Sequence, residues 1–123
     1  MRFSFVVAEY NHSIFGALKN ALDQAYVEWN KEPMGPIAYA AMGGTRAPEH
    51  LRNIAVEPDM VAVHGAVHIG DADMFAIQPM GGNRDIAKIE THLLPAAKNL
   101  LDDIVWWGKV LMAARAEAAQ KAA

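Results

Sequence analysis

Residues 3–13 read Phe-Ser-Phe-Val-Val-Ala-Glu-Tyr-Asn-His-Ser, which is a short apolar run followed by a polar cluster. The run at residues 3–8 is rich in strand-forming residues and is typical of a strand buried on both faces of a parallel sheet. Glu9, Tyr10, Asn11, His12 and Ser13 follow it, and Ser13 is a suitable N-cap for a helix. The stretch therefore predicts a strand, a polar loop and the start of a helix.

Downstream, the same alternation continues. Apolar residues at helical spacing from Ile14 to Trp29 predict a helix that ends before Pro33. Further strands are expected at residues 36–41, 60–63 and 66–69, and loops at residues 42–46 and 70–83. Helices are expected at residues 47–56 and 86–117, with a kink possible near Pro95.

Strands that alternate with helices predict an α/β fold: a parallel sheet with helices on both faces. Ligands of such sheets bind at the carboxyl ends of the strands, where residues 9–13 and 42–46 would lie. Helix N-termini favour polar or anionic groups, and paired glycines at Gly43 and Gly44 could form a backbone nest. The alternatives are a plain helix cap in the first loop and a tight turn in the second.

Composition limits the possible functions. The 123 residues predict one domain, 1–123, and the net charge of −3 gives no sign of nucleic-acid binding. No cysteine is present, and no apolar segment approaches the ~20 residues that cross a membrane, so we expect a cytoplasmic protein. His64, His68, Asp71 and Asp73 lack the tight spacing of a metal site. Motifs for nucleotide triphosphates, dinucleotides or a serine nucleophile are absent.

Trp106 and Trp107 lie on the last predicted helix, whose apolar face is unusually broad. Core packing explains one indole, and a subunit contact is expected to use the other face, because aromatic residues are enriched in interface cores.

Three stretches together resemble the NADPH-dependent FMN reductases, a family with a flavodoxin-like fold. They are residues 9–14 continuing through 16–23, residues 43–47 running into Leu51-Arg52, and residues 101–107. The resemblance spans nearly the whole chain in the family's order. It implies a flavodoxin-like three-layer sandwich, truncated to the C-terminal two-thirds of the family fold.

The resemblance also implies a site. FMN would lie along Glu9, Tyr10, Asn11, His12 and Ser13, and its ring would be bordered by Gly43, Gly44, Thr45 and Arg46. NADPH would be the co-substrate, with electrons passed to a quinone, free flavin, azo dye or metal ion. Because the cofactor supplies the chemistry, no residue is assigned a catalytic role and no metal site is expected.

The chain departs from the family pattern. Ala8 and Phe15 replace prolines, and the family's first strand, phosphate-binding loop and first helix have no counterpart. Residues 3–8 would then form an apolar sheet edge, which invites pairing. We therefore predict a homo-oligomer, a dimer or tetramer that covers the 3–8 edge and the 93–112 helix. The alternative function is a non-catalytic flavodoxin-like module that binds FMN weakly or not at all.

Overall fold

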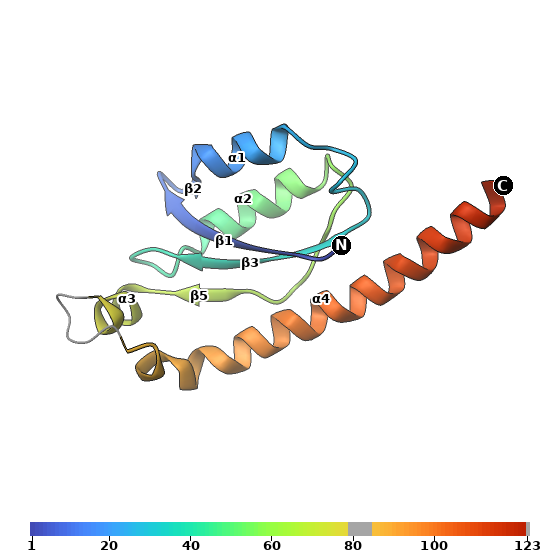
Figure 1. Ribbon diagram of the computed structural model, residues 1–123. Coiled ribbons are helices and arrows are strands. Elements are labelled where there is room, and N and C mark those ends of the chain that lie inside the picture. Colours follow the sequence, from blue (N-terminus) through green and yellow to red (C-terminus); the bar gives the residue numbers. More distant parts are fainter. Residues whose placement is uncertain (79–84, 123) are drawn as a thin grey trace.

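A parallel sheet lies between two helical layers in the computed structural model, which describes residues 1–78 and 85–122 (Figure 1). The parallel strands are β1 (Phe3–Tyr10), β3 (Pro33–Tyr39), β4 (Val61–Ala62) and β5 (Val67–Ile69). β1 pairs with one edge of β3, while β4 and β5 pair with β3 at Pro33–Met34 and at Ile37–Tyr39. The predicted α/β sandwich with a parallel sheet is confirmed.

Helices cover both faces of the sheet. α1 (Gly16–Asp23) and α2 (Arg46–Ala55) lie on one face, α4 (Ala87–Ala122) crosses the other, and α3 (Asp71–Ile77) sits near one end (Figure 1). The first core cluster, between the sheet and α1 and α2, includes Val7, Met34 and Leu51. The second, under α4, is built from Val63, Val67, Leu100 and Ile104. Each face of the sheet thus has its own core.

α4 is the longest element, with 36 residues and hence a length of about 54 Å. It continues through Pro95 without interruption, and its last turns extend past the sheet (Figure 1). Arg115 anchors this extension, because its Nη2 lies 3.2 Å from Oε1 of the buried Glu32. None of the described helices is apolar enough over a sufficient length to cross a membrane.

The prediction for the first helix was wrong at both ends. The helix begins at Gly16 after an N-cap at Phe15, because Ser13 belongs to a short strand, β2 (Ser13–Ile14). It ends at Asp23, and the chain then turns so that the Trp29 indole donates to the carbonyl of Leu22 at 3.1 Å. This bond returns Trp29 to the first core by a turn rather than by a continuous helix.

The loop predicted at residues 70–83 is also corrected, because α3 occupies its first half. Asp71 and Asp73 lie in the first turn of α3, where negative charge favours a helix, and Asp73 accepts a bond from the Gly70 amide at 3.3 Å. Residues 79–83 lie outside the described part of the chain.

The two tryptophans lie in different surroundings on α4, and the predicted core packing of one indole is confirmed. Trp107 packs against the second core, whereas Trp106 is exposed on α4. Their rings meet edge to face at a centroid distance of 5.0 Å.

Candidate functional site

The polar cluster at residues 9–13 begins within β1 and forms a hairpin rather than an open loop. Tyr10 pairs with Ser13 and Glu9 with Ile14, which leaves Asn11 and His12 as a two-residue turn. Both turn residues have positive φ, 48° at Asn11 and 66° at His12, as a type I′ hairpin requires. Asn tolerates this conformation well, and His tolerates it at a cost. The hairpin therefore places these two side chains just beyond the carboxyl end of β1.

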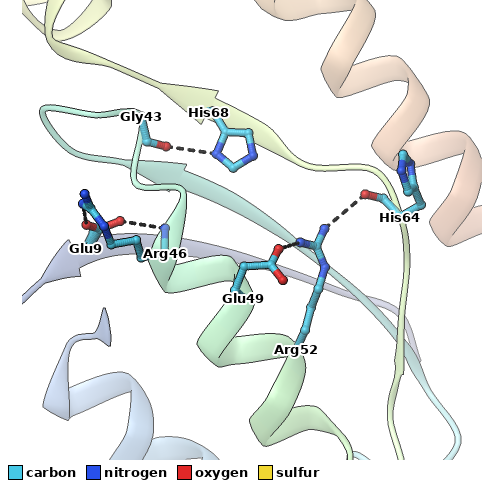
Figure 2. A network of polar contacts seen from close by, with 7 residues as sticks. All are labelled: Glu9, Gly43, Arg46, Glu49, Arg52, His64 and His68. Carbon is cyan, nitrogen blue, oxygen red and sulfur yellow. Dashed lines mark hydrogen bonds and ion pairs between the residues drawn. The ribbon is translucent and has the colours of Figure 1, made fainter. Parts of the chain in front are cut away.

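The second candidate loop, residues 40–45, turns tightly through two glycines. Gly43 and Gly44 have φ of 73° and 61°, and the Gly43 amide donates to the carbonyl of Ala40 at 2.9 Å. A Cβ on Gly44 would lie 2.9 Å from the backbone nitrogen of Tyr39, so glycine is required there. The Gly43 carbonyl lies 3.0 Å from Nδ1 of His68 (Figure 2). The backbone of this loop therefore forms a tight turn, whatever ligand its residues bind.

Glu9 and Arg46 join the two loops. The backbone amide of Arg46 donates to Glu9 Oε2 at 2.9 Å, and its Nη1 donates to Oε1 at 2.8 Å (Figure 2). The side chain of Glu9 is only 7% exposed. The Arg46 side-chain hydrogen bond, followed in importance by bonds from the amides of Arg46 and Ala47, holds the pKa of Glu9 below its usual value. Thr45, the N-cap residue of α2, makes no side-chain cap bond, and Glu9 of β1 instead accepts from the amides of Arg46 and Ala47 in the first turn of α2.

A cavity of about 670 Å³ opens beside the hairpin at the carboxyl ends of β1 and β3. Three aromatic side chains line it, together with polar groups of the hairpin. Its lining residues are Ala8, Tyr10, Asn11, Ser13, Ile14, Phe15, Gly16 and Tyr39. We call it the hairpin cavity; aromatic walls with a few polar groups are typical of small-molecule sites.

A second cavity, of about 570 Å³, lies beside the first turn of α2. It is lined by His12, Thr45, Arg46, Glu49, His50 and His68. The structure therefore divides the residues predicted from the sequence: Tyr10, Asn11 and Ser13 line the hairpin cavity, and His12, Thr45 and Arg46 line the second. Gly43 and Gly44 shape the turn that carries Thr45 and Arg46.

Sequence reasoning missed several contributors. His50 lines the second cavity, and its Nδ1 lies 2.8 Å from Ser13 Oγ. Tyr39 enters the hairpin cavity from the end of β3, and His68 enters the second cavity from β5. These partners are distant in sequence, so only the strand order could have brought them together.

The histidine and acidic side chains that were considered as metal ligands do not form a metal site among the described residues. Among residues 1–78 and 85–122, no three His, Cys, Asp or Glu side chains are grouped as metal ligands. The carbonyl of His64 accepts a bond from Arg52 Nη2 at 3.1 Å, while His68 faces Gly43 (Figure 2).

The hairpin cavity suits the flat part of a flavin. Tyr10, Phe15 and Tyr39 offer aromatic surface, and Asn11 and Ser13 offer hydrogen-bonding groups for polar ring edges or sugar hydroxyls. A Cβ on Gly16 would meet no atom within 4 Å, so the first turn of α1 leaves open space beside the cavity. Its lining, taken from the described residues, includes no Lys or Arg side chain for a phosphate.

Comparisons with known proteins agree with this architecture. A sequence profile of the family described as NADPH-dependent FMN reductase matches residues 3–73, which include both candidate loops. The chain is 47% identical over 47 residues to the NAD(P)H-dependent FMN reductase ntnL of Nectria sp, covering 38% of this chain and 23% of that protein. It is 40% identical over 53 residues to an NAD(P)H-dependent FMN reductase of Schizosaccharomyces pombe, and this match covers 43% of this chain and 26% of that protein.

A solved structure has the same fold. FerB, a flavoenzyme NAD(P)H:(acceptor) oxidoreductase from Paracoccus denitrificans, superposes with a TM-score of 0.65 at 24% identity, over 85% of this chain and 61% of FerB. The fold is thus flavodoxin-like. The matched part of this chain corresponds to about a quarter of the length of the curated relatives and to less than two-thirds of the length of FerB. Because the family profile covers more than half of its residues, the chain belongs to the NADPH-dependent FMN reductase family.

Proposed function

We propose that this chain provides the flavin-ring site of an NAD(P)H-dependent flavin oxidoreductase. The observation that carries the proposal is the hairpin cavity, which is lined by aromatic and neutral polar side chains at the carboxyl ends of β1 and β3. Bound FMN would supply the chemistry, taking hydride from NAD(P)H and passing electrons to a quinone, free flavin, azo dye or metal ion.

The protein's part in this reaction is placement. Tyr10 and Tyr39 would flank the ring, and Asn11 and Ser13 would hydrogen-bond its polar groups. Glu9 acts as a positioning residue, because both of its carboxylate oxygens already bind Arg46. Gly43, Gly44, Thr45 and Arg46 would border the flavin from the second loop, and His12 from the hairpin turn.

A second candidate function is a flavodoxin-like module that binds FMN weakly or not at all. The cavity lining favours it in one respect, because none of its described side chains is cationic and the phosphate of FMN would need such a partner from elsewhere.

Flavin fluorescence separates the two functions. We expect FMN fluorescence to be quenched on titration with the chain, and Tyr10→Ala to weaken binding roughly 5- to 10-fold through lost stacking. Tyr26→Ala is the matched control, since Tyr26 is exposed and lies outside the hairpin cavity. NADPH oxidation by the FMN-loaded chain would support the reductase, and no quenching at millimolar FMN would leave only the non-catalytic module.

A further inference from the structure

One hydrogen bond joins the hairpin cavity to the second cavity. His50 of α2 lines the second cavity, and Ser13 of β2 lines the hairpin cavity. Nδ1 of His50 lies 2.8 Å from Oγ of Ser13. A change in the protonation of His50 therefore reaches a side chain of the hairpin cavity through direct contact.

This hydrogen bond can run in either direction. A serine hydroxyl has one O–H donor and two acceptor lone pairs, whereas an imidazole nitrogen donates or accepts according to whether it carries a proton. If Ser13 donates to Nδ1 of His50, the Ser13 oxygen can only accept from a ligand. If Nδ1 instead donates to Ser13, the hydroxyl proton of Ser13 is free for an acceptor atom of the ligand.

The charge of His50 decides the direction of the bond. In the neutral ring, an unprotonated Nδ1 is a stronger base than a hydroxyl oxygen, so Ser13 donates to it, as serine does to histidine in nucleophilic pairs. In the imidazolium both ring nitrogens carry protons, so Nδ1 must donate and the bond reverses. Histidine side chains change between these two forms between about pH 5 and about pH 8.

Two charged neighbours of His50 on α2 are already paired. Arg46 binds the Glu9 carboxylate of β1, and Glu49 binds Arg52 one turn further along α2 (Figure 2). Each pair contains one positive and one negative side chain, so these four residues add little net charge beside His50. The histidines of the second cavity are therefore the groups whose charge changes in this range of pH.

The other two histidines of the second cavity have different surroundings. Nδ1 of His68, on β5, lies 3.0 Å from the carbonyl of Gly43. A carbonyl oxygen can only accept, so this nitrogen keeps its proton in both charge states and the bond does not reverse. His12, in the hairpin turn, lines the second cavity and not the hairpin cavity. Protonation of His50, by contrast, reverses a bond to a residue of the hairpin cavity.

We propose that His50 is a positioning residue that switches the Ser13 hydroxyl from acceptor to donor toward the ligand of the hairpin cavity. The inference rests on the proposed function, in which this ligand is the flavin ring. The polar edge of an oxidised flavin presents mainly acceptors, which are its carbonyl oxygens and unprotonated ring nitrogens. The donor form of Ser13 binds such an edge more tightly, so the affinity for oxidised flavin rises as His50 takes up a proton.

Riboflavin is the probe, because it carries the flavin ring without the FMN phosphate, whose own charge changes near about pH 6. We titrate the full chain into riboflavin and follow the quenching of its fluorescence at pH 5 and at pH 8. One additional hydrogen bond should make binding to the wild type roughly 3- to 10-fold tighter at pH 5. Ser13→Ala and His50→Phe should each abolish this difference.

Two further variants separate the switch from a structural role. His50→Asn places an amide where Nδ1 lies, so it should bind riboflavin better than His50→Phe, with equal affinity at both pH values. His64→Asn is the matched control, because His64 is exposed and lines neither the hairpin cavity nor the second cavity. This variant should keep the pH dependence of the wild type.

Nitrogen NMR of the imidazole tests the switch without flavin. At pH 8 we expect Nδ1 of His50 to be unprotonated, with a chemical shift that Ser13→Ala changes. A proton on Nδ1 at pH 8, or the same shift in both proteins, would overturn the proposal.

The two readouts fail separately. Riboflavin binding that is equal at both pH values, or a pH dependence that persists in Ser13→Ala, would overturn the role of His50 and leave the flavin site standing. No riboflavin binding at either pH would count against the proposed function, while the NMR result would still decide which way the Ser13–His50 bond runs.

Discussion

Replacing Gly44 by alanine should destabilise the protein much more than replacing Gly43, although both glycines have positive φ. A Cβ on Gly43 would meet its nearest neighbour, the Cβ of His68, at 3.4 Å, which is an ordinary contact. A Cβ on Gly44 would lie 2.9 Å from the nitrogen and 3.1 Å from the carbonyl carbon of Tyr39. Backbone atoms of a sheet strand cannot rotate away as a side chain can.

The magnitude follows from two costs. A left-handed alanine costs about 1–2 kcal/mol in either variant. Overpacking against fixed atoms adds roughly 1–3 kcal/mol at Gly44 only. The total for Gly44→Ala is about 2–5 kcal/mol, and a domain of this size loses about 4 °C in Tm per kcal/mol.

Thermal unfolding by circular dichroism measures the difference, with Gly16→Ala as a second control. Gly16 is in the first turn of α1 with open space around it, so alanine there should raise stability by about 0.5–1 kcal/mol. Equal Tm values for Gly43→Ala and Gly44→Ala would refute the close approach of this loop to β3.

Further predictions concern stability. Lowering the pH from about 5 to about 3 should destabilise the wild type more than Glu9→Gln in urea titrations, because Arg46 lowers the folded-state pKa of Glu9. The contribution of Glu9 to stability is complete above its pKa in the unfolded chain and is lost as the pH falls through its lower pKa in the folded protein. The same dependence of stability on pH in the wild type and in Glu9→Gln would contradict this. Leu100→Ala should lower the free energy of unfolding, measured with denaturant, by about 2–5 kcal/mol, because Leu100 is buried. Leu101→Ala, at the exposed neighbouring position, should lower it by less than about 1 kcal/mol. The reverse order would mean that α4 packs on the sheet with its other face. His12→Gly should raise stability by roughly 0.5–1 kcal/mol in thermal melts by relieving a left-handed histidine, and a loss would refute the hairpin turn.

Apolar periodicity predicted much of this fold. The run at residues 3–8, the amphipathic residues 47–56 and the spacing along residues 93–112 each correspond to an observed element: β1, α2 and α4. These segments are long or strongly patterned, and each buries its apolar side in a core.

The errors arose where short-range signals were weak or misleading. A type I′ turn is usually marked by glycine, and Asn11-His12 lacks that mark, so the hairpin appeared as a helix start. Gly and Pro residues at 79–82 dominated the reading of residues 70–83, although the acidic first turn of α3 was visible in the sequence. Helix α1 ends at Asp23, and Trp29 returns to the core through a turn in which its indole bonds the Leu22 carbonyl, a contact that periodicity does not report.

The site shows a related limit. Sequence placed residues 9–13 and 43–46 at one edge of the sheet, and the Glu9–Arg46 pair confirms that the two loops meet. It could not show that these residues line two separate cavities, because that depends on the direction in which each side chain points. Tyr10 and Ser13 line one cavity and His12 the other, although all three belong to the same hairpin.

This division assigns Glu9 a different task from its neighbours. Its carboxylate is nearly buried, binds the amide and the guanidinium of Arg46, and supplies the cap that Thr45 does not. A ligand that bound the Glu9 carboxylate would have to compete with these hydrogen bonds and would leave the first turn of α2 uncapped. The carboxylate therefore joins the hairpin to the glycine turn. Under the proposed function, ligand contacts would fall to Tyr10, Asn11 and Ser13 in the hairpin cavity and to His12 and Arg46 in the second cavity. Under this arrangement, Glu9→Gln should change FMN affinity through the spacing of the two loops, and Asn11→Ala should change it through direct contact.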